Sequence, residues 1–252
     1  MYGHAALEDE ALPVAPRRQG AGWIRIPARV FSVIMSNRKA MAGMFILAVF
    51  IIMAIFAPLI APYDPHGTDF LPSAPPSHDH LLGTTSYGQD IFSQLVWGAR
   101  QTLIIGGLAG LAATLLSVLI GVSAAYLGGI TDHVLSVFID IFLVIPALPL
   151  MIIIAAYAKG GGMWVLILVI AITGWSFGAR QIRPQALSLR NRDFLESARV
   201  RGEGRAYIIL FEVLPNMISL TVAIFLGAAL YAVLAAAGLQ FIGLGTVEEI
   251  SW

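Results

Sequence analysis

Residues 41–61, "MAGMFILAVFIIMAIFAPLIA", form a run of 21 amino acids without a charged side chain. At about 1.5 Å of rise per residue, a helix of this length crosses the roughly 30 Å hydrocarbon core of a bilayer. The run begins after 40 residues of chain, and it is longer than the roughly 7–15-residue apolar core of a cleavable signal peptide. We therefore expect a permanent membrane-spanning helix.

Four further apolar runs follow, and together they predict the fold class. They cover residues 101–131, 134–158, 163–179 and 217–239, and the one charged residue within them is Asp140. The whole chain is 58% hydrophobic and 12% charged, against roughly 25% charged residues in soluble domains. We predict an all-α polytopic membrane protein with five transmembrane helices in a membrane domain over residues 41–252.

The distribution of lysine and arginine predicts the orientation. Of these 15 residues, six lie within residues 1–40 and seven within residues 180–216. Four predicted spans separate the two regions, so both are expected in the cytoplasm under the positive-inside rule. Residues 62–99 contain neither residue type and are predicted to form an exterior loop. Within the N-terminal tail, residues 23–35 are predicted to lie on the inner membrane face as an amphipathic segment, the alternative being a plain helical lead-in to the first span.

Composition and motifs argue against several classes of protein. The net charge is zero and cysteine is absent, which disfavours nucleic-acid binding and excludes disulfides and thiolate metal sites. "GWSFG", around Ser176, matches the nucleophile elbow of serine hydrolases, but that motif requires a strand before it and a helix after it, and here it ends a predicted span. "HDH", residues 78–80, is interpreted as part of a solvated loop and not as a metal site. No lysine lies in a phosphate-binding Gly-Lys-Ser/Thr motif, so energy for transport must come from an ion gradient or from a separate subunit.

The stretch "FLESARVRGEG", residues 194–204, concentrates charge between the fourth and fifth spans. The composition of residues 193–201 suits a short helix ended by Gly202. Small residues at Ser197 and Ala198 would let another surface approach closely, and the arginines would supply charge-assisted hydrogen bonds for docking. A solvated loop whose arginines only fix the topology is the alternative.

This stretch resembles the EAA loop of bacterial ABC-importer permeases, in which Glu-Ala-Ala is followed after three residues by Gly and after nine by Ile-x-Leu-Pro. The corresponding residues are Glu196-Ser197-Ala198, Gly202 and Glu212-Val213-Leu214-Pro215. Segments along residues 43–252, among them "GGITDHVLSVFIDIFLVIP" and "GLQFIGLG", are similar to the C-type subunit of the dipeptide/oligopeptide/nickel permease family. The resemblance implies the type I ABC-importer permease fold.

The same resemblance implies the site and the partners. The residues expected to couple to the ATPase are Glu196, Ser197, Ala198, Arg199, Arg201, Gly202, Leu214 and Pro215. The implied partners are a homologous permease, two ATPase subunits that bind ATP and Mg, and an exterior substrate-binding protein, with no cofactor on this chain. The implied location is the bacterial cytoplasmic membrane, and the substrate class stays open between peptides, oligosaccharides and nickel. An ion-gradient-driven transporter or channel is the alternative function.

Two intramembrane residues and the C-terminus carry further expectations. Asp140 is interpreted as a structural group that pairs with a loop arginine or caps backbone, with substrate contact as the alternative. Pro146 is expected to kink its helix. Members of the resembled family continue after a Ser-Trp-Gly into a sixth span, whereas this sequence stops at Trp252; with five spans the C-terminus would lie outside.

Overall fold

A computed structural model describes residues 37–157 and 162–243, and its regular elements within these ranges are helices. The expected tail segment at 23–35 and the chain end near Trp252 lie outside the described residues. The membrane-length helices are α2 (Arg38–Ile55), α4 (Ile91–Leu127), α7 (Gly162–Arg190) and α11 (Ile218–Phe241). The bent pair α5 (Gly129–Val144) and α6 (Ala147–Tyr157) gives a fifth span if it is counted as one. The predicted all-α fold is confirmed.

The chain divides into two compact units, residues 1–48 and 49–252, and the division falls within α2. Of the first unit, the structure describes residues 37–48, which include the start of α2. The Asn37 side chain accepts a hydrogen bond of 3.0 Å from the Lys39 backbone N–H, which satisfies one of the free donors at the start of the helix. The second unit holds the remaining helices, including the short α3 (Ala57–Ile60).

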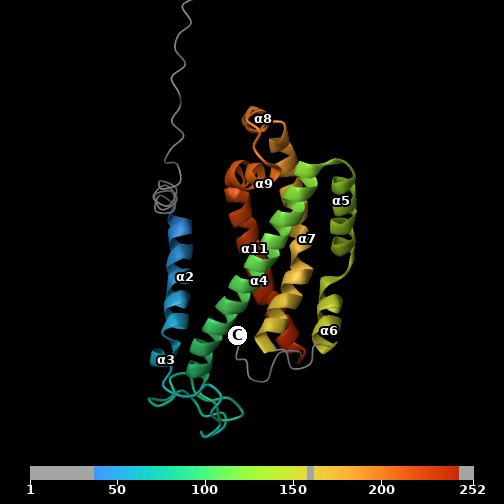
Figure 1. The fold of residues 1–252 in the computed structure, drawn as a ribbon. Helices are drawn as coiled ribbons and strands as arrows, with labels where there is room; N and C mark the ends of the chain where they lie inside the picture. Colours follow the sequence, from blue (N-terminus) through green and yellow to red (C-terminus); the bar gives the residue numbers. More distant parts are fainter. Residues whose placement is uncertain (1–36, 158–161, 244–252) are drawn as a thin grey trace, which may run out of the picture. The chain divides into compact units, whose positions relative to one another are not determined.

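The core of the second unit is a bundle in which α4 packs against both α7 and α11 (Figure 1). Glycines permit the close approach. A Cβ added to Gly110 on α4 would lie 2.8 Å from the Ala229 Cα on α11, and one added to Gly121 would lie 2.9 Å from the Ala179 carbonyl oxygen on α7. Because lipid tails are as apolar as leucine, helices in membranes associate mainly through such close packing of small residues.

The helix α7 extends further than the sequence predicts. The apolar run ends at Ala179, but the helix continues for three more turns to Arg190 and includes Pro184. Ile182 and Ala186 in this extension are buried, so packing maintains the helix where the composition becomes charged. The region from 180 to 216, predicted as a loop, therefore begins as a rigid extension of the fourth span.

The span from 134 to 158 is broken. Helix α5 ends at Val144, α6 begins at Ala147, and their axes differ by 85°. Pro146 lies in the break, as its expected role as a kink residue requires, because proline cannot donate the backbone hydrogen bond that would continue the helix. The break is sharper than a kink.

The segment before α4 is folded, in contrast to the solvated loop that the sequence predicts, and it ends at Asp90 where α4 begins. The Thr84 hydroxyl accepts a hydrogen bond of 2.9 Å from the Ala74 N–H. His80 packs on the rings of Tyr63 and Phe70, and its Nδ1 lies 3.0 Å from Asp90 Oδ1. The described residues contain no cluster of three metal-ligating side chains.

Asp90 joins this segment to the bundle. Its other carboxylate oxygen accepts hydrogen bonds from the Ser93 N–H and hydroxyl, at 2.8 and 2.7 Å, and so caps α4. Burial opposes ionisation of Asp90, but the hydrogen bonds from Ser93 and His80 outweigh it and hold the pKa of the carboxyl below its usual value.

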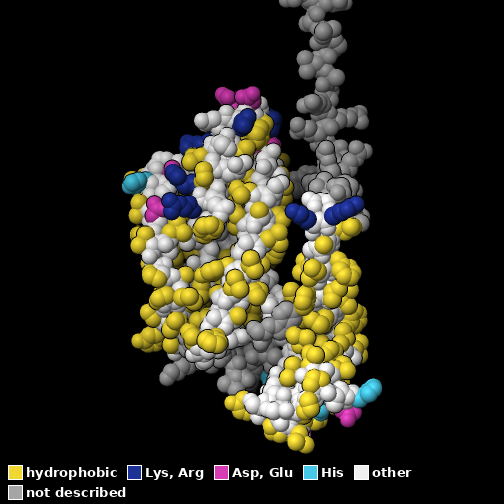
Figure 2. Space-filling view, turned by 180° about the vertical axis from the view of Figure 1, so that it is seen from behind, with side chains coloured by type: hydrophobic (Ala, Val, Ile, Leu, Met, Phe, Trp, Pro, Cys, Tyr) yellow, Lys and Arg dark blue, Asp and Glu magenta, His cyan; other side chains and the backbone are white. Residues whose placement is uncertain are grey.

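The flank and the end of the second unit differ in chemistry. Large apolar side chains that are exposed cover the flank of the bundle, among them Leu119, Val144 and Leu226. Figure 2 shows Lys, Arg, Asp and Glu side chains gathered at the end of the bundle beyond this flank. The pattern of an apolar belt with a charged end is that of a protein embedded in a bilayer.

Candidate functional site

The short helix α8 (Asp193–Val200) lies at the charged end of the bundle, as Figure 1 shows. Acidic residues in its first turn, Asp193 and Glu196, interact favourably with the positive end of the helix dipole. Gly202 has a φ of +79° and donates its N–H to the Arg199 carbonyl at 3.0 Å. The Glu203 N–H donates to the Ala198 carbonyl at 3.2 Å. Together these bonds form a Schellman motif, which explains why a glycine ends the helix here.

One face of α8 is embedded in the bundle. Leu195 and Ala198 are 0% exposed and belong to a buried cluster with side chains from α4 and α7, such as Val122 and Ile182. Burial of a leucine side chain stabilises a fold by about 1.5–3 kcal/mol. The expectation that Ala198 offers a small surface to a partner is wrong for this structure, because the methyl group packs against its own chain.

The other face of α8 is open. Asp193, Glu196, Ser197, Val200 and Arg201 border a wide depression of about 440 Å³. The Ser197 hydroxyl donates to the Asp193 carbonyl at 2.9 Å, so this small side chain lies close to the helix backbone. We refer to these five residues as the α8 outer face.

Two arginines beside α8, Arg199 and Arg201, are bound within the chain. Arg199 donates from Nη2 to the Arg190 carbonyl at 3.1 Å and lies over the Tyr126 ring. Arg201 pairs with Glu203 at 2.8 Å and lies 3.8 Å from Glu212. The hydrogen bond to Glu203 raises the pKa of Arg201. These contacts hold α8 in place, whereas the sequence suggested docking as the role of the arginines.

The segment after Gly202 returns the chain to the bundle. It contains α9 (Arg205–Tyr207), a π-helix (Ile208–Val213) and α10 (Leu214–Asn216). Pro215 has no N–H to give to the preceding turn, and a widened π turn precedes it, as is common where the regular helical ladder is interrupted. Leu214 is half-buried against the same cluster as Leu195. Leu214 thus packs in the same cluster as the buried face of α8, and neither Leu214 nor Pro215 borders its outer face.

An ion pair joins α5 to the extension of α7 at this end of the bundle. Arg183 donates to the two carboxylate oxygens of Asp132, at 2.6 and 2.8 Å. Next to it, the Arg190 guanidinium lies against Gly128, the residue with a φ of +66° that begins the turn between α4 and α5. These contacts fix the start of α5 against α7.

Asp140 does not make the loop-arginine pair that the sequence suggested. It lies eleven residues after the first residue of α5, is exposed, and makes no ion pair or hydrogen bond within the described chain. Arg183, whose charge interacts with that of Asp140, forms its ion pair with Asp132. The expectation that Asp140 is paired or caps backbone is therefore not met within this chain.

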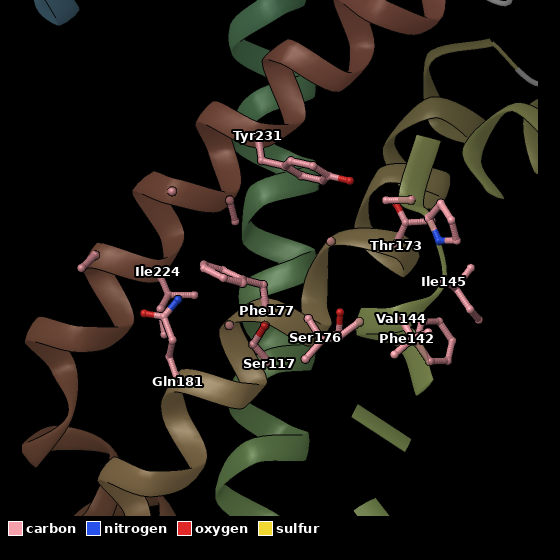
Figure 3. A pocket seen from close by; sticks show the side chains of 18 residues that line it. Ser117, Phe142, Val144, Ile145, Thr173, Ser176, Phe177, Gln181, Ile224 and Tyr231 are labelled. Carbon is pink, nitrogen blue, oxygen red and sulfur yellow. The ribbon is translucent and has the colours of Figure 1, made fainter. Parts of the chain in front are cut away.

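A cavity of about 670 Å³ opens beside the break between α5 and α6, with Pro146 in its wall. Its walls come from α4, α5, α6, α7 and α11, and Figure 3 shows the Tyr231 ring reaching from α11 into the cavity on the side opposite Ile145. The labelled residues of the lining are Ser117, Phe142, Val144, Ile145, Thr173, Ser176, Phe177, Gln181, Ile224 and Tyr231.

The cavity includes Ser176, the residue of the nucleophile-elbow pattern. Ser176 lies in the middle of α7, with helix on both sides. The strand and tight turn that expose a catalytic serine are thus absent at this position. The structure gives no support to the hydrolase hypothesis.

Comparison with known proteins identifies the family. A family model described as "Binding-protein-dependent transport system inner membrane component" matches residues 117–249, more than half of the chain. The chain belongs to this family. A second model, "N-terminal TM domain of oligopeptide transport permease C", matches residues 28–76 of the permease.

Curated relatives of this permease cover most of its length. It is 33% identical over 219 residues to the oligopeptide transport system permease protein OppC of Bacillus subtilis (strain 168), a match that covers 86% of this chain and 72% of that protein. It is 34% identical over 245 residues to the dipeptide transport system permease protein DppC of Alkalihalophilus pseudofirmus, covering 94% of this chain and 75% of that one. The protein is thus a multi-pass membrane permease subunit of a binding-protein-dependent ABC importer.

Sequence reasoning missed three features of this permease. The cavity depends on which faces of five helices turn inward, and periodicity does not show this in runs that are apolar all round. The Asp132–Arg183 pair joins residues 51 positions apart. The sequence did contain one signal for the folded segment before α4, because glycines are typical of sharp turns, and Gly83 and Gly88 both have a φ near +80°. The residues that these turns bring together lie elsewhere in the segment, and the glycines do not identify them.

Proposed function

We propose that this permease carries short peptides across the bacterial cytoplasmic membrane and takes its energy from ATPase subunits that dock on the α8 outer face. The relatives named as oligopeptide and dipeptide permeases support the substrate class. The observation that carries the proposal is the division of α8 into a buried face and an open polar face, at the charged end of the bundle. Such a helix transmits a push from outside directly to the core.

The proposed complex contains a homologous permease, two ATPase subunits and an exterior substrate-binding protein. ATP and Mg would be bound by the ATPases, with no cofactor on this chain. In this arrangement the N-terminal tail and α8 face the cytoplasm, and the folded segment over residues 62–90 faces the binding protein. The positions of the lysine and arginine residues support this orientation.

The proposed mechanism follows from the packing of α8. Leu195 and Ala198 share one buried cluster with residues of α4, α7 and α11. Close-packed clusters move as units and do not deform smoothly. When the ATPases close around ATP, a displacement of α8 would therefore shift these helices together and change the access to the cavity.

Affinity purification of the permease from its native membrane in mild detergent tests the assembly. We expect a second permease and P-loop ATPases to co-purify, and ATP-dependent peptide import after reconstitution with the binding protein. Glu196→Arg reverses a charge on the α8 outer face and should reduce ATPase recovery, whereas Asp79→Arg, at the opposite end of the bundle, should leave it unchanged. A permease that purifies alone and transports on an ion gradient would refute the proposal.

The absence of native cysteine allows a clean test of the orientation. Tyr87 is 75% exposed, so Tyr87→Cys should react with a membrane-impermeant maleimide in spheroplasts. Ser197→Cys should react only after the membrane is opened. The reverse pattern would overturn the proposed orientation.

A further inference from the structure

The cavity beside the break between α5 and α6 has a lining that carries no charge among the described residues. The described residues around it include aromatic, aliphatic and glycine positions, three hydroxyl-bearing Ser and Thr residues and the amide of Gln181. Its volume, about 670 Å³, falls within the roughly 300–1,000 Å³ of small-molecule sites. A space of this size could hold part of a solute, a lipid chain or a helix.

The hydroxyl groups of the lining distinguish among these occupants. Ser117 donates to the carbonyls of Ala113 and Trp175, and Thr173 donates to that of Val169. Ser176 is 3% exposed and lies in the cavity wall, and it makes no hydrogen bond within the described chain; its oxygen is not among the fully buried unpartnered atoms. Its hydroxyl therefore borders the cavity without a partner.

A hydroxyl is destabilising when an occupant shuts it off from water and offers it no hydrogen-bond partner. A lipid chain or an apolar helix face would leave this hydroxyl unpaired when it filled the cavity. A peptide group of a solute would satisfy it, since each peptide unit brings a carbonyl acceptor and an N–H donor. The polar requirement thus favours a solute with amide groups.

The remaining lining selects against charge. A charged side chain that entered the cavity would lose water and find no opposite charge, which is strongly unfavourable. Apolar and aromatic side chains would instead contact Phe142, Phe177 and Tyr231, which are part of the lining. Gly227, also in the lining, has no atom within 4 Å of the position of an added Cβ, so the wall is open beside it.

We propose that the cavity is a side-chain subsite for the transported peptide: it takes an uncharged, apolar or aromatic side chain, and the Ser176 hydroxyl hydrogen-bonds to the adjacent peptide group. The proposal rests on the proposed function, because it assumes a peptide substrate. It adds a selectivity contributed by the permease itself, beyond that of the binding protein.

A pair of glycine substitutions tests the subsite. Gly227→Phe places a ring in the cavity, and Gly107→Phe, on α4 and outside the lining, is the matched control, since a Cβ there also meets no atom within 4 Å. The complete complex in proteoliposomes, with saturating binding protein, is given tripeptides with central leucine, phenylalanine or glycine. Gly227→Phe should lower import of the leucine and phenylalanine peptides about tenfold, in the range expected for loss of a hydrophobic pocket, and that of the glycine peptide less than about twofold. Gly107→Phe should change none.

A change of selectivity provides a second test that does not depend on loss of activity. Gly227→Asp puts a carboxylate into the cavity, so import of a tripeptide with central lysine should rise relative to the leucine peptide by about tenfold or more, as an opposite charge within about 4–6 Å favours the charged form. Ser176→Ala should lower import of each of the uncharged peptides, and the factor should be the same for the leucine, phenylalanine and glycine peptides. This would identify contact with the common backbone.

Several outcomes would overturn the subsite. One is equal import by the two phenylalanine variants; another is an equal loss for leucine and glycine peptides. Loss of the partner permease from the Gly227→Phe complex alone would show that a helix fills the cavity. If Gly227→Phe fails to assemble for any other reason, unchanged selectivity in Gly227→Asp refutes the proposal. Failure of the wild-type complex to import peptides with ATP would instead refute the proposed function.

Discussion

Removal of the charge from Asp132 should loosen the attachment of α5 to α7 by a predictable amount. Asp132→Asn keeps the shape of the side chain and leaves Arg183 without its carboxylate. In the structure, this pair has two hydrogen bonds of 2.6 and 2.8 Å, and the Arg183 and Asp132 side chains are 33% and 21% exposed. The pair is therefore neither fully solvated nor buried.

The magnitude follows from this partial exposure. Hydrogen bonds to charged groups contribute about 1.5–3 kcal/mol net, and solvent-exposed ion pairs at most about 1 kcal/mol. We expect Asp132→Asn to lower the free energy of unfolding by about 1.5 kcal/mol. For a chain of this size each kcal/mol shifts Tm by about 2–4 °C, so Tm should fall by about 3–6 °C.

The assay is thermal unfolding in detergent of Asp132→Asn, of the single variants Asp132→Arg and Arg183→Asp, and of the double variant that exchanges the two residues. Asp132→Arg combined with Arg183→Asp should be more stable than the sum of the single changes by about 1 kcal/mol, because the exchange restores the attraction. Arg180→Gln is the control, since Arg180 is on the same helix, is exposed and forms no ion pair within the described chain; it should change stability by less than about 0.5 kcal/mol. Additivity of the single effects within about 0.5 kcal/mol would show that the pair contributes nothing.

Three further predictions concern other parts of the molecule. The pKa of Asp90 is lowered in the fold, so the stability that its ionised carboxylate contributes is present above the unfolded pKa of about 3.9 and is lost as pH falls through the lower folded value. Hydrogen exchange of residues 62–90 should therefore accelerate as pH falls through this range. Asp90→Asn, which also weakens the contact with His80, should remove this pH dependence. Gly202→Ala should speed exchange of the α8 terminus about 5- to 30-fold, since left-handed backbone disfavours alanine by about 1–2 kcal/mol, whereas Gly202→Asn should have a smaller effect; equal rates would refute this explanation of the glycine. Gly110→Leu should lower Tm, because its side chain would collide with the backbone at Ala229, and an unchanged Tm would mean that α4 and α11 separate easily.

The membrane helices could be predicted from the sequence because their signal is local. An uncharged run of about 20 residues has few other structures available in a bilayer. The helix over residues 193–201 and its glycine end could be predicted for the same reason, since capping depends on a few neighbouring residues. The extension of α7 could not, because buried contacts at Ile182 and Ala186 maintain it, and those partners are distant in sequence.

The roles of single residues near α8 were less predictable. Ala198 and Ser197 are adjacent small residues in the sequence, but a helix turns them to different sides, and tertiary packing decides which side is buried. Asp132 and Asp140 are both acidic residues of α5, and the charge of each one acts on Arg183. The choice of Arg183 between them depends on how α5 lies against α7, and no local pattern encodes that geometry.

The break between α5 and α6 has a consequence for how the chain enters the membrane during synthesis. The two helices contain 16 and 11 residues, so their lengths at about 1.5 Å per residue are roughly 24 and 17 Å, each short of a 30 Å hydrocarbon core. Neither segment is long enough to insert as an independent span, and the open backbone between them is unfavourable in lipid. Stable insertion of this region should therefore wait until α7 has been synthesised, because α7 supplies Arg183 and the packing surface that hold the broken pair in place.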